Sequence, residues 1–587
     1  MTQTTINLQT TLKRQFKSYH LLVFLAILVI GFAVYFNSLE SSFHFDDQAY
    51  IQGNPNIRTL TNLDVTFWAN PTVFLTYLSF ALNYQYAHFE VFGYHVFNTF
   101  IHIFSSYLVY WLLFLTLKIE TNDKIKRYPH LIPFFSALLF LCHPLQTQAV
   151  TYIAQRATSL ATLFYLLGLV LYIKARLSEN VWILTLAAII TAMAMFTKEI
   201  AFTLPITICV YDFIFLNYKK EPLPTRLATF FPFLLSLLII PSIRFFYLAL
   251  KGTPTFSNIA LETTAIPKLH YLFTEFNVIR TYLRLLFLPI NQNIDYDYPI
   301  STNLFELHTL LSLTLLISLL LIAIKALKHH KSIAFGIFWF FITLSVESSF
   351  IPIKDVIFEH RLYLPMVGFS LFASVGLFSI LNNIKPYIIS LSFIICALSF
   401  LTTERNKIWK NEISLWGDSV QKNPTNPRAL QNSANAYLQE VRPLDALPYL
   451  ENAIKYAKNR KMMDDATTVS LYNLGRVYVI IKKYTLAIQS LSEAVSRHPD
   501  FAQAWAFLGF AYQNTGDYKK AEDAYKRSEQ INPNNPTLYE FLSSYFKKIH
   551  NDQKAEVYLR KALKLRGLDE ATIESLLNNQ SFKGKNK

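Results

Sequence analysis

The chain of 587 residues is 52% hydrophobic and only 16% charged. A soluble protein of this length would carry more charge and divide into several domains, so the composition argues against that class. The formal net charge of +15 would suit a nucleic-acid-binding protein. The lysines and arginines, however, gather at alternate ends of apolar runs, which is typical of membrane proteins. We therefore expect a multi-pass membrane protein and no nucleic-acid partner.

Apolar runs near the length that crosses a bilayer recur as far as Thr402. The first, Leu21–Phe36, follows a basic polar segment and precedes no small-residue cleavage site, so we interpret it as an uncleaved span. Tyr271–Pro289 contains three charged residues, and we expect it to lie at the interface or against protein. About eleven spans result, the others being 95–117, 131–141, 158–173, 181–196, 202–216, 227–250, 307–324, 333–350, 366–381 and 386–402.

The basic loops predict the orientation of these spans. Lysine and arginine accumulate on the cytoplasmic side of membrane proteins. This rule places in the cytoplasm the N-terminus, 118–127, 174–176, 219–220, 325–331 and Lys385. An odd number of spans then puts the C-terminal part outside.

After Thr403 a tetratricopeptide repeat is expected, because the sequence repeats with the 34-residue period of that motif. Leu471 and Trp505 start equivalent copies, in which small residues let paired helices approach and large ones fill the space between repeats. The packing residues are Gly475, Tyr478, Trp505, Gly509 and Tyr512. We expect an all-α chain with a membrane domain at 1–402, a linker at 403–428, repeats at 429–565 and a basic tail at 566–587.

Several polar clusters fall on one side of the predicted membrane, the outside. Ionisable residues at span ends tend to line a cavity or to pair with one another. The clusters are Asp46-Asp47, His143 with Arg156, Lys198-Glu199, the segment 291–297 with Asp295 and Asp297, and Glu359-His360-Arg361.

Each cluster also has a purely structural interpretation. The two aspartates would cap a helix in a solvated loop. Lys198 and Glu199 would form an internal ion pair. Arg156 and Arg361 would reach the lipid headgroups, and His143 would bond backbone at a helix end. Because all the clusters are predicted on the external side of the membrane, we expect them to form a common site.

The ordered motifs along the chain resemble those of one family. They read FDDQAYIQGNPNI, GYHVFNTFIH, HPLQTQAVTYIAQRATSL, TKEIAFTLP, VIRTYLRLLFLPINQNIDYDYP and EHRLYLPMVGF. In this order and followed by tetratricopeptide repeats, the chain resembles the transmembrane and tetratricopeptide-repeat-containing O-mannosyltransferases and their bacterial relatives, which are C-type glycosyltransferases. The resemblance implies an enzyme of the bacterial inner membrane that takes a sugar, mannose in the family, from a polyprenyl-phosphate carrier on the outer face.

The resemblance also implies a catalytic acidic motif in the first external loop, where Asp46 and Asp47 lie. A carboxylate within hydrogen-bond reach of a serine or threonine hydroxyl can accept its proton. We favour Asp47 slightly as this base, with Asp46 ordering the loop or helping to bind a divalent cation. Two carboxylates are too few ligands to predict a metal site. Aromatic neighbours would offer apolar faces to a sugar.

The phosphate of the donor requires cations on the other side of the site. Arginine binds phosphate with two parallel hydrogen bonds and stays charged. Arg361 and Arg156 are the first candidates, followed by Lys198 and His360. Glu199 and Glu359 would orient these cations, and we expect support from His143, Asp295 and Asp297.

Two other interpretations stay open on the sequence. The enzyme would act on a lipid or a cell-envelope glycan, with the repeats recruiting assembly partners rather than an exported acceptor protein. Alternatively, the chain would be a non-catalytic scaffold or a transporter. A transporter should show internal repeats or broken helices near the middle of the membrane, and the polar clusters instead lie at span ends.

Overall fold

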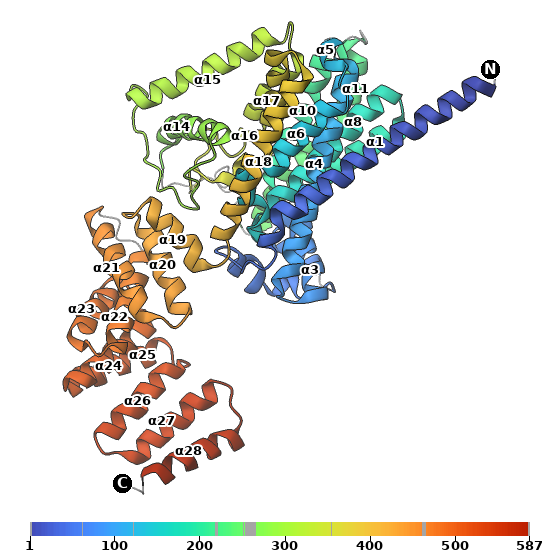
Figure 1. Ribbon diagram of the computed structural model, residues 1–587. Helices are drawn as coiled ribbons and strands as arrows, with labels where there is room; N and C mark the ends of the chain where they lie inside the picture. Colours follow the sequence, from blue (N-terminus) through green and yellow to red (C-terminus); the bar gives the residue numbers. More distant parts are fainter. Residues whose placement is uncertain are drawn as a thin grey trace. The chain divides into compact units, whose positions relative to one another are not determined.

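The computed structural model describes residues 3–61, 63–120, 123–217, 221–250, 252, 266–353, 355–460 and 465–584 (Figure 1). Every regular element in these ranges is a helix, which confirms the predicted all-α class. The basic pair at 219–220, used above for orientation, lies outside the described residues. The chain divides into two compact units, Met1–Leu415 and Trp416–Lys587, which are described separately.

The first unit contains the predicted membrane helices. Seven helical segments of the described chain are long and apolar enough to cross a bilayer, namely Ser18–Ser38, Val91–Ile119, Ile153–Ser178, Glu199–Leu216, Leu223–Leu250, Leu307–Ala326 and Ile384–Ile408. Four shorter apolar helices are Leu131–Cys142, Val181–Ala194, Lys331–Leu344 and Pro365–Leu381. Each of the expected spans coincides with one of these segments, which indicates an integral membrane protein. Its orientation stays a prediction.

The helices of the first unit follow the apolar runs closely. The segment 271–289 forms a further helix, α14, with charged residues along it. The bounds are α1 Gln3–Tyr35, α2 Leu63–Ala69, α3 Phe74–Ala87, α4 Val91–Ile119, α5 Asp123–Lys126, α6 Leu131–Cys142, α7 Thr147–Val150, α8 Arg156–Ser178, α9 Val181–Ala194, α10 Leu204–Tyr211, α11 Leu223–Leu235, α12 Ile239–Leu250, α14 Lys268–Phe287, α15 Leu307–Ala326, α16 Lys331–Leu344, α17 Pro365–Leu381 and α18 Ile384–Ile408.

Helix α4 packs against α1, α6 and α8 (Figure 1). Its consecutive residues 112–117 are all buried. A helix segment that is apolar on every side is expected to be surrounded by protein or lipid, and protein covers this part of α4, whereas Phe100 and Phe104 nearer its start are exposed. Beyond the helix ends, short irregular segments follow α1, α6, α9 and α16. These segments bring the polar clusters together.

A buried charge network joins the ends of α8, α10 and α11. Asp212, in the turn that continues α10, accepts hydrogen bonds from the Tyr172 hydroxyl (2.6 Å), from Arg176 Nε (3.2 Å) and from Arg226 Nε (3.0 Å). Arg176 also pairs with Glu221 at 2.6 Å. Because buried charges are costly unless paired and hydrogen-bonded, this cluster fixes how the three helices meet.

The second unit is a series of helix pairs. Each helix packs on its partner and on the next pair, as in a tetratricopeptide solenoid. The bounds are α19 Glu412–Lys422, which starts just before this unit, then α20 Pro427–Gln439, α21 Pro443–Asn459, α22 Asp465–Ile480, α23 Tyr484–Arg497, α24 Ala502–Thr515, α25 Tyr518–Ile531, α26 Pro536–Lys548, α27 Asp552–Leu565 and α28 Glu570–Gly584.

The packing residues of the repeats occupy the positions that the motif requires. A Cβ atom at Gly509 would lie 2.6 Å from Tyr525, and one at Gly475 would overlap Leu491, so each glycine permits a close helix pair. Tyr478 and Tyr512 pack in the core of the repeats, and the Trp505 ring nitrogen donates to the Pro499 carbonyl (2.8 Å). Helix α19 lies within the expected linker, and α28 covers most of the expected tail.

Candidate active site

The first unit contains a cavity of about 550 Å³ beside the loop that follows α1. Its wall combines acidic, basic and aromatic side chains from segments far apart in the sequence. The charged and imidazole side chains are Asp46, Lys198, Glu199, Arg244, Glu347, His360 and Arg361, and the aromatic ones are Tyr50, Tyr77, Phe80, Phe202 and Phe358. Three of the five predicted polar clusters therefore meet at one cavity.

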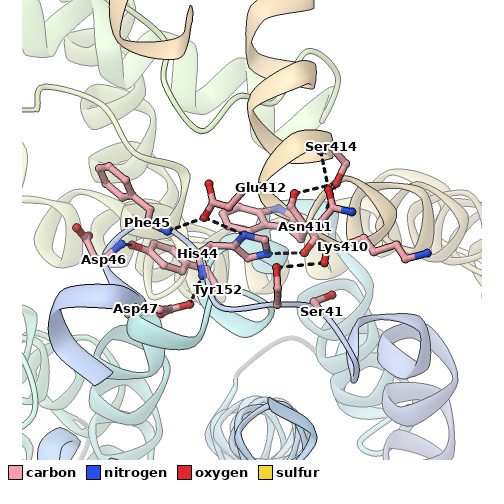
Figure 2. Close-up of polar contacts among 12 residues, drawn as sticks. Ser41, His44, Phe45, Asp46, Asp47, Tyr152, Lys410, Asn411, Glu412 and Ser414 are labelled. Carbon is pink, nitrogen blue, oxygen red and sulfur yellow. Dashed lines mark hydrogen bonds and ion pairs between the residues drawn. The ribbon is translucent and has the colours of Figure 1, made fainter. Parts of the chain in front are cut away.

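The two adjacent aspartates have different surroundings. Asp46 lines the cavity, whereas Asp47 is fully buried and does not. Figure 2 shows the two carboxylates pointing in different directions. The slight preference for Asp47 as the base therefore has no geometric support, and the side chain that a substrate in the cavity would meet is Asp46.

Asp47 organises the loop. Its Oδ2 accepts the backbone N–H of His44 (2.8 Å) and its Oδ1 accepts that of Ala154 (2.6 Å), which ties this loop to the segment before α8. Burial raises the pKa of Asp47 from 3.8 to about 7, although the two N–H donors and the nearby His44 oppose the shift.

This raised pKa predicts a pH-dependent stability. Between pH 3.8 and about 7 the folded state holds a proton on Asp47 that the unfolded chain releases. The contribution of Asp47 to the free energy of unfolding is therefore complete below about pH 4 and is lost as the pH rises to about 7. We expect the midpoint of thermal unfolding to decline over this window less steeply in Asp47→Asn than in the wild type. Parallel curves for the two proteins would contradict the shift.

Lys198 and Glu199 both line the cavity, but they do not pair with each other. The Lys198 ammonium lies 2.8 Å from Glu347 and donates to the Thr158 hydroxyl (2.9 Å). Glu199 forms an ion pair with Arg244 of α12. The cavity wall thus contains two ion pairs, and each joins a residue of 198–199 to another helix or loop.

His360 and Arg361 lie in a short helical turn before α17. Two N–H groups of the Arg361 guanidinium donate to the carbonyl oxygens of Val356 (2.9 Å) and Asp355 (2.6 Å). A guanidinium has five N–H donors, and these carbonyls do not neutralise its charge. Burial, together with the positive charges of Lys198 and Arg361, lowers the pKa of His360 well below its usual range. The imidazole in the cavity wall is therefore neutral.

Arg156 and His143 take structural positions instead of the predicted ones. The Arg156 guanidinium does not line the cavity, and it donates to Asn98 (2.6 Å) and Asn83 (2.6 Å), which binds α8 to α3 and α4. His143 donates from Nε2 to the Leu286 carbonyl (3.1 Å) and accepts the Leu145 N–H, as the structural interpretation of this histidine expected.

Glu359 and the segment 291–297 bond to each other outside the cavity wall. Glu359 accepts hydrogen bonds from the Gln292 amide (2.8 Å) and from the Asn293 N–H (2.7 Å). It therefore anchors the segment that contains Asp295 and Asp297, and none of the three carboxylates lines the cavity. Glu359 orients this loop rather than a cation.

Two charged residues of the cavity were missed by the sequence analysis. Arg244 lies inside an apolar run, and Glu347 lies at the end of another. An ionisable residue within a membrane span is by default a candidate for a functional site, and that rule would have identified Arg244. Within the described residues, no group of three or more His, Cys, Asp and Glu side chains could hold a metal ion.

Comparisons with known proteins agree with the motifs. The tetratricopeptide-repeat family models match residues 469–501 and 502–535. The chain is 24% identical to the human protein O-mannosyl-transferase TMTC3, over 87% of this chain and 64% of the relative. It is 25% identical to the Caenorhabditis elegans protein O-mannosyl-transferase F38B6.6, over 74% of this chain and 62% of the relative.

These matches confirm the resemblance to the protein O-mannosyl-transferases over most of the chain. The chain spans less than two thirds of the length of either relative. Among solved structures, the tetratricopeptide protein YrrB covers 35% of this chain and matches over 97% of its own, with 18% identity and a TM-score of 0.24. That likeness is too low to add to the argument.

Proposed function

We propose that this chain is a membrane glycosyltransferase that moves a sugar, with mannose as the first candidate, from a polyprenyl-phosphate carrier to serine or threonine hydroxyls of exported proteins. One observation carries the proposal: Asp46 and three cations line the same cavity, among aromatic side chains. A hydroxyl that must lose a proton and a phosphate that must leave require these opposite charges in one place.

The step is a displacement at the anomeric carbon of the sugar. The acceptor oxygen forms a bond to this carbon while the bond from the carbon to the phosphate oxygen breaks. Asp46 accepts the hydroxyl proton as the attack develops. The carrier leaves as a polyprenyl phosphate, which takes the electron pair of the broken bond.

Arg361 is the best-placed ligand for the phosphate. Lys198 and Arg244 are already paired with Glu347 and Glu199, so their charges are largely balanced. Arg361 donates to carbonyl oxygens instead, and the carboxylates of Glu347 and Glu275 act on it only through their charge, so its guanidinium keeps N–H groups for a phosphate. The remaining wall includes Tyr50 and Tyr77, whose rings suit the apolar face of a sugar.

The repeats would recruit the acceptor protein or a partner. Aromatic rings line up along every second helix of the repeats: the ring centroids of Tyr472 (α22) and Phe507 (α24) lie 5.8 Å apart, and those of Phe507 and Phe541 (α26) lie 5.0 Å apart. Half-buried aromatic residues are common in protein-binding surfaces. We place the protein in a bacterial inner membrane with a cytoplasmic N-terminus and external repeats, as the basic loops and the family resemblance suggest.

The test is transfer by the purified full-length protein in lipid vesicles. The sugar donors are polyprenyl-phosphate mannose and polyprenyl-phosphate glucose. The acceptors are a short Ser/Thr peptide, a folded exported protein and a cell-envelope glycan. We expect mannosyl transfer to the first two acceptors, with the folded protein preferred. Transfer only to the glycan would favour a lipid- or glycan-modifying enzyme. No transfer from any donor, together with retained binding of a protein partner, would favour a scaffold.

A further inference from the structure

The loop that contains Asp46 is held by a segment more than 360 residues later, where α18 ends and α19 begins (Figure 2). The Ser42 N–H donates to the carbonyl oxygen of Lys410 (3.1 Å), and Nε2 of His44 lies 2.6 Å from the carbonyl oxygen of Trp409. Because a carbonyl oxygen only accepts, Nε2 carries the proton. All these residues belong to the first unit.

Of the contacts that residues 409–412 make with the loop, the one from Glu412 lies closest in sequence to Asp46. Its Oε1 accepts the backbone N–H of Phe45 (3.0 Å) and lies 3.4 Å from Nδ1 of the buried His44. Glu412 is the first residue of α19, where a negative charge interacts favourably with the helix dipole. The negative charge of Glu412 is therefore favoured at this end of α19, beside the loop.

Phe45 has a backbone conformation that needs this support. Its φ of +42° lies in the left-handed region, which a bulky residue rarely adopts and which persists only where the surroundings determine it. Glu412 fixes the N–H of Phe45, and the next N–H, that of Asp46, donates to the Tyr152 hydroxyl (2.9 Å). The peptide groups on both sides of Phe45 are thus anchored.

Tyr152 is itself held by the same distant segment. Its ring stacks on Trp409, with the ring centroids 5.5 Å apart. The strained turn at Phe45 sets the direction in which Asp46 leaves the backbone, so any relaxation of this turn would move the carboxylate in the cavity.

We propose that Glu412 is a positioning residue for the transfer reaction, because it holds Phe45 in its left-handed conformation and so keeps Asp46 directed into the cavity. This inference rests on the proposed function of Asp46. Glu412 does not line the cavity, so it acts through the backbone of Phe45 and not on the substrate.

A graded series at position 412 of the full-length protein tests the inference. Glu412→Ala removes the acceptor of the Phe45 N–H. A displacement of about 1 Å in a reacting group can cost 10²-fold, so we expect kcat to fall by about 10²-fold while the donor KM is unchanged. Glu412→Gln keeps an oxygen that accepts the same N–H and should restore most of kcat. Glu404→Ala is the control, since Glu404 is an exposed carboxylate of α18 that pairs with Lys407 on the same helix.

The outcomes separate this inference from the proposed function. An inactive wild type would overturn both. An active wild type with an equally active Glu412→Ala would overturn the inference alone. The inference also fails if Glu412→Gln is as slow as Glu412→Ala, because an acceptor for Phe45 would then be present without effect. A normal thermal midpoint in Glu412→Ala, with the low kcat, supports positioning over a general loss of folding.

Discussion

Asp46→Asn should reduce sugar transfer by about 10²–10⁴-fold, because an amide of the same size cannot accept the proton of the acceptor hydroxyl. Asp46 is the aspartate of the pair that lines the cavity. Asp46 is only half-buried, so we expect its neutralisation to change the free energy of unfolding less than that of a fully buried carboxylate. The measurement is the transfer rate from a polyprenyl-phosphate sugar, with expression and the thermal midpoint recorded for each variant.

Asp47→Asn is the matched control for this prediction. The amide nitrogen cannot accept a hydrogen bond, so one of the two buried N–H groups, that of His44 or Ala154, loses its acceptor. We expect a loss of about 1–3 kcal/mol in stability, seen as a lower thermal midpoint that Asp46→Asn does not share. Near-wild-type transfer by Asp46→Asn would end the proposal that this residue is the base. If Asp46→Asn were both slow and less stable than the wild type, the loss of transfer would be attributed to misfolding and not to a missing base.

The apolar runs were sufficient to predict the membrane helices. Hydropathy and length fix where a helix can cross a bilayer, and these properties are local in the sequence. The tetratricopeptide repeats were predicted equally well, because their period and their packing residues are also local. For example, Gly509 must be small to allow its contact with Tyr525, whichever partner the repeats bind.

The details of the site depend on backbone angles that the sequence does not reveal. Lys198 has an extended backbone, with φ −165° and ψ 152°. A short helical turn begins directly after it, at Glu199, so the two neighbours enter the cavity wall from different backbone conformations and find separate partners. The left-handed turn at Phe45 similarly decides which aspartate meets the cavity. Arg156 bonds to Asn98 and Asn83 of other helices instead of lining the cavity, and such contacts between distant segments cannot be read from its own position in the sequence.

The second large effect is expected on stability rather than on catalysis. In the buried network around Asp212, the side chains of Asp212, Arg176 and Arg226 are 0%, 11% and 7% exposed. Asp212→Asn keeps the shape of the side chain but leaves two buried arginines without their shared carboxylate. Removing one partner of a buried ion pair typically costs 3–5 kcal/mol. We therefore expect a markedly lower thermal midpoint in detergent and a reduced yield in the membrane.

Glu221→Gln provides the comparison for Asp212→Asn, because it removes a carboxylate from the same network at its more exposed edge. Glu221 is 23% exposed, and its partner in the network is Arg176. Such partly solvated pairs contribute about 1 kcal/mol or less to stability. Neither residue lines the cavity, so the folded fraction of each variant should transfer sugar at the wild-type rate. If the two variants were equally stable, the charge of Asp212 would be dispensable. The network would then owe its stability to helix packing, since the buried arginines would have found other acceptors or solvent.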